Sequence, residues 1–86
     1  MTTAVVIGAG LGGLALAIRL QAAGVATTIV EARDQPGGCA GFRQCDGYTF
    51  DTGPTAITDP DSFAALWALS GQDMAADVTL DRIEPF

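Results

Sequence analysis

The chain contains no histidine and no lysine, and its four cationic residues are all arginines. Ten acidic residues give a formal net charge of −6 at pH 7. Because a surface of this sign repels nucleic-acid phosphates and anionic lipids, we expect no nucleic-acid partner. The two cysteines, Cys39 and Cys45, have no second pair and no histidine beside them. This pattern indicates no metal site and no disulfide scaffold, and it favours a reducing, cytoplasmic location.

The sequence also lacks a long uninterrupted apolar run. Residues 4–18 come nearest, but they include several glycines, follow no basic residue and fall short of the ~20 residues of a membrane span. The 86 residues are fewer than the roughly 100–150 of a typical domain, yet 49% of them are hydrophobic. We therefore expect an N-terminal piece of a larger protein, whose apolar surface further sequence would cover.

Glycines, in contrast, are plentiful, and several of them have a recognisable spacing. Gly8, Gly10 and Gly13 form the pattern G-x-G-x-x-G directly after the apolar residues 4–7, which suit a strand buried on both faces of a parallel sheet. In this pattern the first glycine permits a tight turn, the second lets a diphosphate approach the backbone, and the third lets the helix pack close to the strand. Free N–H groups and the helix dipole then stabilise the diphosphate.

The context on the carboxyl side fits the same unit. Residues 11–23 predict a helix buried on most of its surface and capped by Gly24, and residues 27–31 predict a second strand. Glu31 lies 18 positions after Gly13, where an acid binds ribose hydroxyls and repels a 2′-phosphate. The sequence thus predicts an α/β fold, a Rossmann-like FAD/NAD(P)-binding βαβ unit with an incomplete parallel sheet.

Beyond Glu31 the pattern changes. Residues 33–38 predict a loop, and residues 42–51 predict a hairpin that turns at Asp46 and Gly47. Asp59 is the expected N-cap of a helix that ends near Gly71, and residues 78–83 predict a further strand. No group of residues for nucleophilic or paired-carboxylate catalysis is visible, so catalytic residues stay unassigned.

Two segments carry a family resemblance. Residues 31–38 look like the elongated motif of glutathione-reductase-type flavoproteins, which favours FAD over NAD. Residues 47–60, which include Asp51-Thr52-Gly53-Pro54-Thr55, resemble the N-terminal region of the phytoene desaturase family of carotenoid desaturases, and the similarity spans essentially all 86 residues. The resemblance implies an FAD-dependent oxidoreductase of carotenoid biosynthesis that removes hydrogen from an apolar isoprenoid such as phytoene.

The same resemblance implies how the cofactor is held. The first three glycines would bind the FAD diphosphate, Glu31 the adenosine ribose, and Gly37 and Gly38 would let the backbone run close to the cofactor. The full set of candidate cofactor-binding residues is Gly8, Ala9, Gly10, Gly12, Gly13, Glu31, Ala32, Arg33, Gly37, Gly38 and Cys39. The family usually has arginine at the position of Cys39, where its charge can meet cofactor phosphate. We do not expect Arg43 to replace it, because the hairpin can equally point this side chain to solvent.

The resemblance further implies a lipophilic polyene substrate and a full-length protein that associates peripherally with the inner face of the membrane. Residues 1–86 would be the N-terminal part of its FAD-binding domain, without the rest of that domain or the substrate domain, and inert alone. Two alternatives stay open. One is another FAD oxidoreductase, of the amine-oxidase, polyene isomerase or ketolase type. The other is a non-catalytic dinucleotide-binding remnant.

Overall fold

The structure is a computed structural model that describes residues 1–54 and 56–84. Thr55, part of the segment that carries the family resemblance, and residues 85–86 lie outside the described residues. The elements follow in the order β1 (Thr3–Ile7), α1 (Leu11–Ala22), β2 (Ala26–Val30), the short 3-10 helix η1 (Gly38–Ala40), β3 (Phe42–Cys45), β4 (Tyr48–Asp51), α2 (Pro60–Leu69) and the 3-10 helix η2 (Met74–Ala76).

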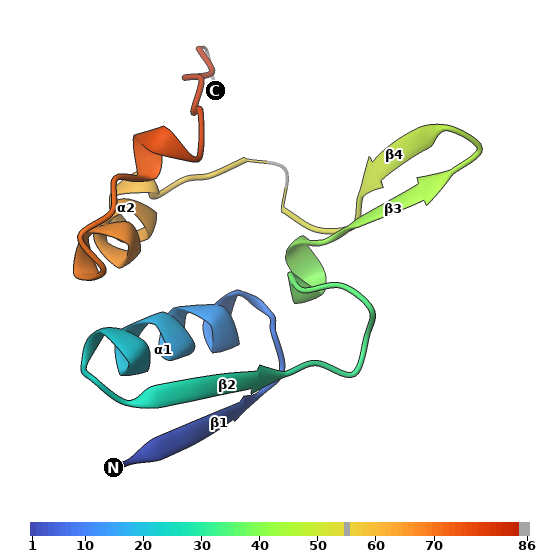
Figure 1. Cartoon of the computed structure of the whole chain (residues 1–86). Coiled ribbons are helices and arrows are strands. Elements are labelled where there is room, and N and C mark those ends of the chain that lie inside the picture. The colour runs from blue at the N-terminus through green and yellow to red at the C-terminus, as the bar shows by residue number, and fades with distance from the viewer. Residues whose placement is uncertain (55, 85–86) are drawn as a thin grey trace.

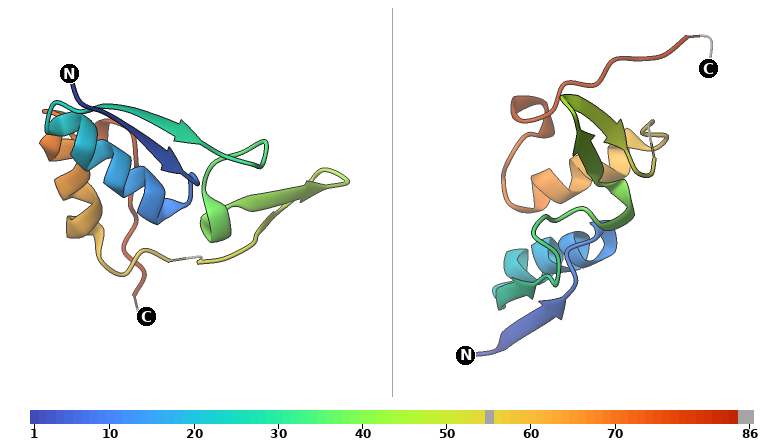
Figure 2. Two further views of the ribbon diagram at one scale, coloured as in Figure 1. Left: turned by 90° about the horizontal axis from the view of Figure 1, so that it is seen from below. Right: turned by 90° about the vertical axis from the view of Figure 1, so that its right-hand side faces the viewer.

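The first three elements form the predicted βαβ unit. Strands β1 and β2 pair in parallel, in a register that runs from Thr3 opposite Ala26 to Ile7 opposite Val30. Helix α1 connects them and covers one face of this two-stranded sheet, while α2 packs on α1 from the side away from the sheet (Figures 1 and 2). The fold class predicted from the sequence, an α/β unit with an incomplete parallel sheet, is confirmed.

Local capping chemistry sets the ends of both long helices. After α1, Gly24 adopts a φ of 88°, and the N–H of Val25 donates to the carbonyl of Leu20 at 3.0 Å, which closes the helix end as expected for glycine at this position. Before α2, the carboxylate of Asp59 accepts a hydrogen bond from the N–H of Ser62 at 3.4 Å. Both predicted caps are confirmed.

The hairpin also matches its prediction. Strands β3 and β4 are antiparallel, and the turn between them places Asp46 at a φ of 52° and Gly47 at 82°. These positive values are the ones that a two-residue hairpin turn requires, and Asp-Gly supplies them at little cost. The hairpin projects away from the βαβ unit (Figure 1), so all eight of its strand residues are exposed.

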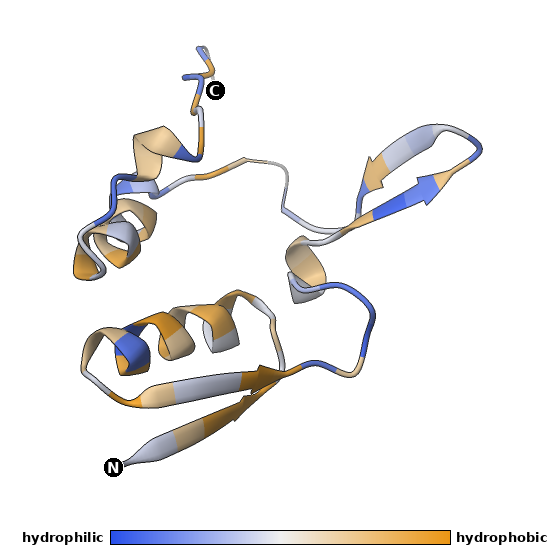
Figure 3. Cartoon of the chain, in the orientation of Figure 1, coloured by the Kyte–Doolittle hydropathy of each residue, from blue (hydrophilic) through white to orange (hydrophobic). Residues whose placement is uncertain are grey.

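Burial in the βαβ unit is lower than the sequence predicts. The face of the sheet toward α1 contains Val6, which is 8% exposed, but Val5 and Ile7 on the other face are 65% and 88% exposed. Figure 3 shows hydrophobic colouring toward the carboxyl ends of β1 and β2. The expectations of a strand buried on both faces and of a mostly buried helix are wrong for this chain. Among the described elements, α1 makes the main contacts with the sheet, and the two strands and α2 make the main contacts with α1.

The strand predicted for residues 78–83 is wrong as well. The chain forms η2 just before this segment, and the N–H of Val78 donates back to the carbonyl of Met74 at 2.9 Å. Residues 78–83 then continue without regular structure. A strand needs a neighbouring strand for its backbone groups, and no described strand lies beside this segment.

Candidate dinucleotide-binding site

The site is centred on the N-terminal end of α1. Gly8 turns the chain at a φ of 102°, and its N–H donates to the carbonyl of Val30 at 2.7 Å, which fixes the turn to the end of β2. The first bond of the helix runs from the N–H of Leu14 to the carbonyl of Gly10 at 2.9 Å. The N–H groups of residues 11–13 precede this bond, and Gly10 has no side chain to cap them. They are available to an anion, as the motif predicts.

The N-terminal end of α1 and the glycine turn before it form what we call the mouth of α1. The glycines at this mouth have different surroundings. A Cβ added to Gly13 would collide with the carbonyl oxygen of Gly8, so only glycine lets α1 lie this close to the turn after β1. A Cβ on Gly12 would meet nothing within 4 Å. The mouth is thus a bare main-chain cradle with open space in front of it, and its shape and hydrogen-bonding groups fit a diphosphate.

Glu31 lies directly after β2 and faces this mouth. One carboxylate oxygen accepts a hydrogen bond from the N–H of Ala9 at 2.8 Å, and the other accepts from the N–H of Arg33 at 3.0 Å. These bonds, the one from Arg33 first, hold the pKa of Glu31 below its ordinary value. The carboxylate is therefore ionised and fixed beside the turn. Its remaining lone pairs can accept from ribose hydroxyls.

The second pair of glycines packs on the first loop. Gly37 and Gly38 have φ values of 117° and 59°, and the N–H of Gly37 donates to the carbonyl of Ala9 at 2.7 Å. A Cβ on Gly38 would approach the Cα of Gly10 to 3.0 Å. The sequence predicts that these glycines let the backbone approach a cofactor. Among the described residues, the contact with the first glycine loop requires a glycine at position 38, and the positive φ favours one at position 37.

The other predicted residues surround a hollow beyond Glu31. This hollow has a volume of about 680 Å³ and lies between the loop after β2 and strand β3. Arg33 and Cys39 line it together with Glu31, and so does Arg43, which is exposed at its rim. Ala32 is exposed in the turn between Glu31 and Arg33. The structure thus brings all the candidate residues to one end of the βαβ unit.

Several residues that line this hollow were not among the predicted candidates, and Gly41 and Thr52 are two of them. Both line the hollow, and the N–H of Thr52 donates to the carbonyl of Gly41 at 3.1 Å. The available signal was the segment around Thr52 that carries the family resemblance, to which the sequence alone assigns no role.

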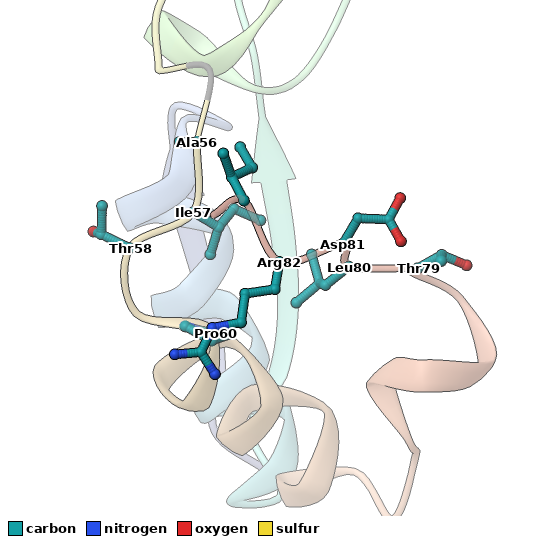
Figure 4. A pocket seen from close by; sticks show the side chains of 9 residues that line it. Ala56, Ile57, Thr58, Pro60, Thr79, Leu80, Asp81 and Arg82 are labelled. Carbon is teal, nitrogen blue, oxygen red and sulfur yellow. The ribbon is translucent and has the colours of Figure 1, made fainter. Parts of the chain in front are cut away.

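A second hollow is lined by different residues. It has a volume of about 670 Å³ and is lined by residues of the segments 56–60 and 79–83, among them Ile57 and Leu80 (Figure 4). None of the candidate residues contributes to it. Within residues 1–54 and 56–84, no helix has the length and apolar character to cross a membrane, and no three potential ligands cluster as a metal site would require.

Comparison with known proteins agrees with this geometry. A sequence model of the NAD(P)-binding Rossmann-like domain matches residues 6–72, which contain both glycine turns and Glu31. The chain belongs to this family. It contains a βαβ unit of the Rossmann type.

Several curated relatives are phytoene desaturases. The chain is 68% identical over 84 residues to a phytoene desaturase (lycopene-forming) of Paracoccus sp., which covers 98% of this chain and 17% of the relative. It is 56% identical over 86 residues to the corresponding enzyme of Pseudescherichia vulneris, with 100% of this chain and 18% of the relative covered. The resemblance inferred from residues 31–60 is confirmed, and the chain spans less than a fifth of the length of these relatives.

A solved structure shows the same fold. The A394C mutant of putrescine oxidase, from a study of redesigned cofactor binding, superposes with a TM-score of 0.60 at 34% identity. The match covers 81% of this chain and 15% of that one.

Proposed function

We propose that this chain is the N-terminal, cofactor-binding part of an FAD-dependent oxidoreductase that desaturates a carotenoid precursor such as phytoene. The observation that carries the proposal is the position of Glu31, whose ionised carboxylate is held 2.8 Å from the N–H of Ala9 at the mouth of α1. An anion here disfavours a 2′-phosphate and suits the ribose of FAD or NAD. Similarity to phytoene desaturases along 98% of the chain favours FAD of the two.

In this proposal each residue has a limited task. The N–H groups of residues 11–13 hold the diphosphate, Glu31 orients the adenosine ribose, and the turn at Gly37 and Gly38 forms the neighbouring wall. When bound, FAD supplies the acceptor for the hydride that leaves an allylic carbon of the polyene. The 86 residues contribute binding and orientation, and we expect them to be inert alone, because they match only 17% of the length of a phytoene desaturase relative.

The cofactor is tested by titrating the purified chain, in the longest form that its gene encodes, with FAD and with NAD. We expect binding to quench the flavin fluorescence in a saturable way that yields a dissociation constant for FAD. We expect NAD to bind more weakly. A chain that binds NAD and leaves FAD free in solution contradicts the proposal.

The substrate is tested in a host that accumulates phytoene. Expression of the longest form should convert phytoene into more unsaturated, coloured polyenes, which chromatography resolves, whereas residues 1–86 alone should leave phytoene unchanged. The likeness to putrescine oxidase makes amine oxidation the second candidate. Turnover of a diamine with peroxide release, and none of phytoene, would favour it.

We also propose that the full-length protein is cytoplasmic and takes up its polyene at the inner face of the membrane. A lipophilic substrate that resides in the bilayer supports this location. Co-sedimentation of the longest form with vesicles that contain phytoene tests it, with recovery in the supernatant as the contrary result.

A further inference from the structure

The segment after β4 has a role that the sequence left open. Thr52 follows the hairpin, and its N–H donates to the carbonyl of Gly41 at 3.1 Å. The hairpin thus begins and ends beside η1, because Gly41 directly follows that helix. Next to this bond, Gly53 lies face to face with the backbone of Cys39. A Cβ on Gly53 would collide with the carbonyl oxygen of Cys39, approach its carbonyl carbon to 2.8 Å and reach the nitrogen of Ala40 at 3.5 Å.

The atoms that Gly53 approaches are main-chain atoms, which cannot rotate away as the end of a flexible side chain can. Gly53 has no positive φ, so the need for glycine here is one of space and not of backbone conformation. Any larger residue has to push the segment 52–53 and the backbone of Cys39 apart.

Such a push would travel to the mouth of α1. Cys39 directly follows Gly38, which lies against Gly10, and Gly37 donates to the carbonyl of Ala9 at 2.7 Å. Three stretches of bare backbone are therefore stacked: the first glycine loop, the turn at residues 37–41 and the segment 52–53. At two of the contacts between them, Gly38 on Gly10 and Gly53 on Cys39, an added Cβ would come within 3.0 Å of main-chain atoms.

We propose that Gly53 is a positioning residue of the dinucleotide site, which holds the turn at residues 37–41 against the first glycine loop. The inference rests on the proposed function, because it assigns Gly53 to the site that would hold FAD. Gly53 acts through the second turn and needs no contact of its own with the ligand.

The test compares three glycine-to-alanine variants in the longest form of the chain. Gly53→Ala should weaken FAD binding about tenfold or more, equivalent to about 1.4 kcal/mol, and speed hydrogen exchange at the N–H of Gly37. Gly41→Ala, whose Cβ would lie 3.2 Å from the carbonyl oxygen of Gly38, should have a smaller effect of the same kind. Gly47→Ala strains the hairpin turn but meets nothing within 4 Å, so it should lower thermal stability and leave FAD affinity unchanged.

Two results overturn the inference: unchanged FAD affinity in Gly53→Ala, or an equal loss of affinity in Gly47→Ala. If Gly53→Ala does not fold, Gly41→Ala decides, because the inference requires weaker FAD binding in a folded protein. If the unaltered chain binds no dinucleotide, the proposed function fails on its own. In that case, hydrogen exchange at the N–H of Gly37 in Gly53→Ala tests whether Gly53 holds the turn in place. Unchanged exchange would refute this positioning role.

Discussion

At the scale of single residues, Glu31 couples the site to pH. Backbone N–H groups bind its carboxylate and hold its pKa below the ordinary value. A depressed pKa in the folded state means that the carboxylate stabilises the fold above the unfolded pKa, and that this contribution is lost as the pH falls through the folded value. The loss therefore begins below about pH 4.3, the ordinary glutamate value.

We expect Glu31→Gln to lower stability and FAD retention at pH 7, and to flatten the acid limb of the stability curve. The measurement is the thermal midpoint of the variant and the unaltered chain from pH 7 to pH 3. Glu84→Gln is the matched control, because Glu84 has no backbone N–H partner among the described residues and its ion pair with Arg82 is exposed to solvent and contributes little. Parallel curves for Glu31→Gln and the unaltered chain would show that the Glu31 carboxylate contributes nothing specific.

A substitution at Cys39 can test the site by making FAD binding tighter. It lines the hollow beside Glu31, at the position where the family resemblance of the sequence leads us to expect arginine. A charge-assisted hydrogen bond contributes about 1.5–3 kcal/mol, so Cys39→Arg should tighten FAD binding by about tenfold or more, as measured by fluorescence titration. Cys39→Ser is the control and should leave affinity unchanged. A loss of FAD in Cys39→Ser would instead give the thiol itself a role.

At the scale of elements, substitutions in the first turn of α1 should affect stability and FAD binding differently. Gly12 sits in the first turn with no atom within 4 Å of an added Cβ, so Gly12→Ala should stabilise the helix by about 0.5–1 kcal/mol. The same methyl group projects where we place the diphosphate, so FAD affinity should fall. Gly13→Ala, which collides with Gly8, should lower both. Thermal midpoint and FAD titration of the two variants check this, and a Gly12→Ala variant that keeps full affinity would move the diphosphate elsewhere.

Elements fixed by neighbouring residues were predictable, and those that need distant partners were not. The turn at Asp46 and Gly47 and the caps at Gly24 and Asp59 follow from side chains within a few positions, and the structure has them where expected. The segment 78–83 has the alternation of a strand but no partner strand among the described residues, so it stays irregular. Pattern alone does not supply the missing hydrogen bonds.

The site divides in the same way. The glycine spacing and Glu31 were recognisable because each residue has a fixed offset from the strand that precedes it. The packing of Gly38 on Gly10, and of Gly53 on Cys39, joins residues far apart in the chain. Such contacts depend on how two turns meet in space, and no spacing rule contains that information.

At the scale of the whole molecule, the chain is open. Its radius of gyration is 15.0 Å, whereas a compact domain of this length has about 12 Å. The buried hydrophobic residues among those described are Val6, Ala9 and Ala17. The uncovered sheet face, with Val5 and Ile7, is the surface on which a full-length relative would place a further layer.

Two substitutions on adjacent residues of β1 measure whether that layer exists. In the 86-residue chain Ile7 is 88% exposed, so Ile7→Thr should change the free energy of unfolding by less than about 0.5 kcal/mol. Val6 is 8% exposed, and Val6→Ala should cost about 1.5–3 kcal/mol in a chain of any length. In the longest form that the gene encodes, Ile7→Thr should become as costly as Val6→Ala, because a second layer then buries Ile7. Guanidinium unfolding of both variants at both lengths gives the comparison, and an Ile7→Thr variant that costs nothing at either length would mean that this face stays uncovered.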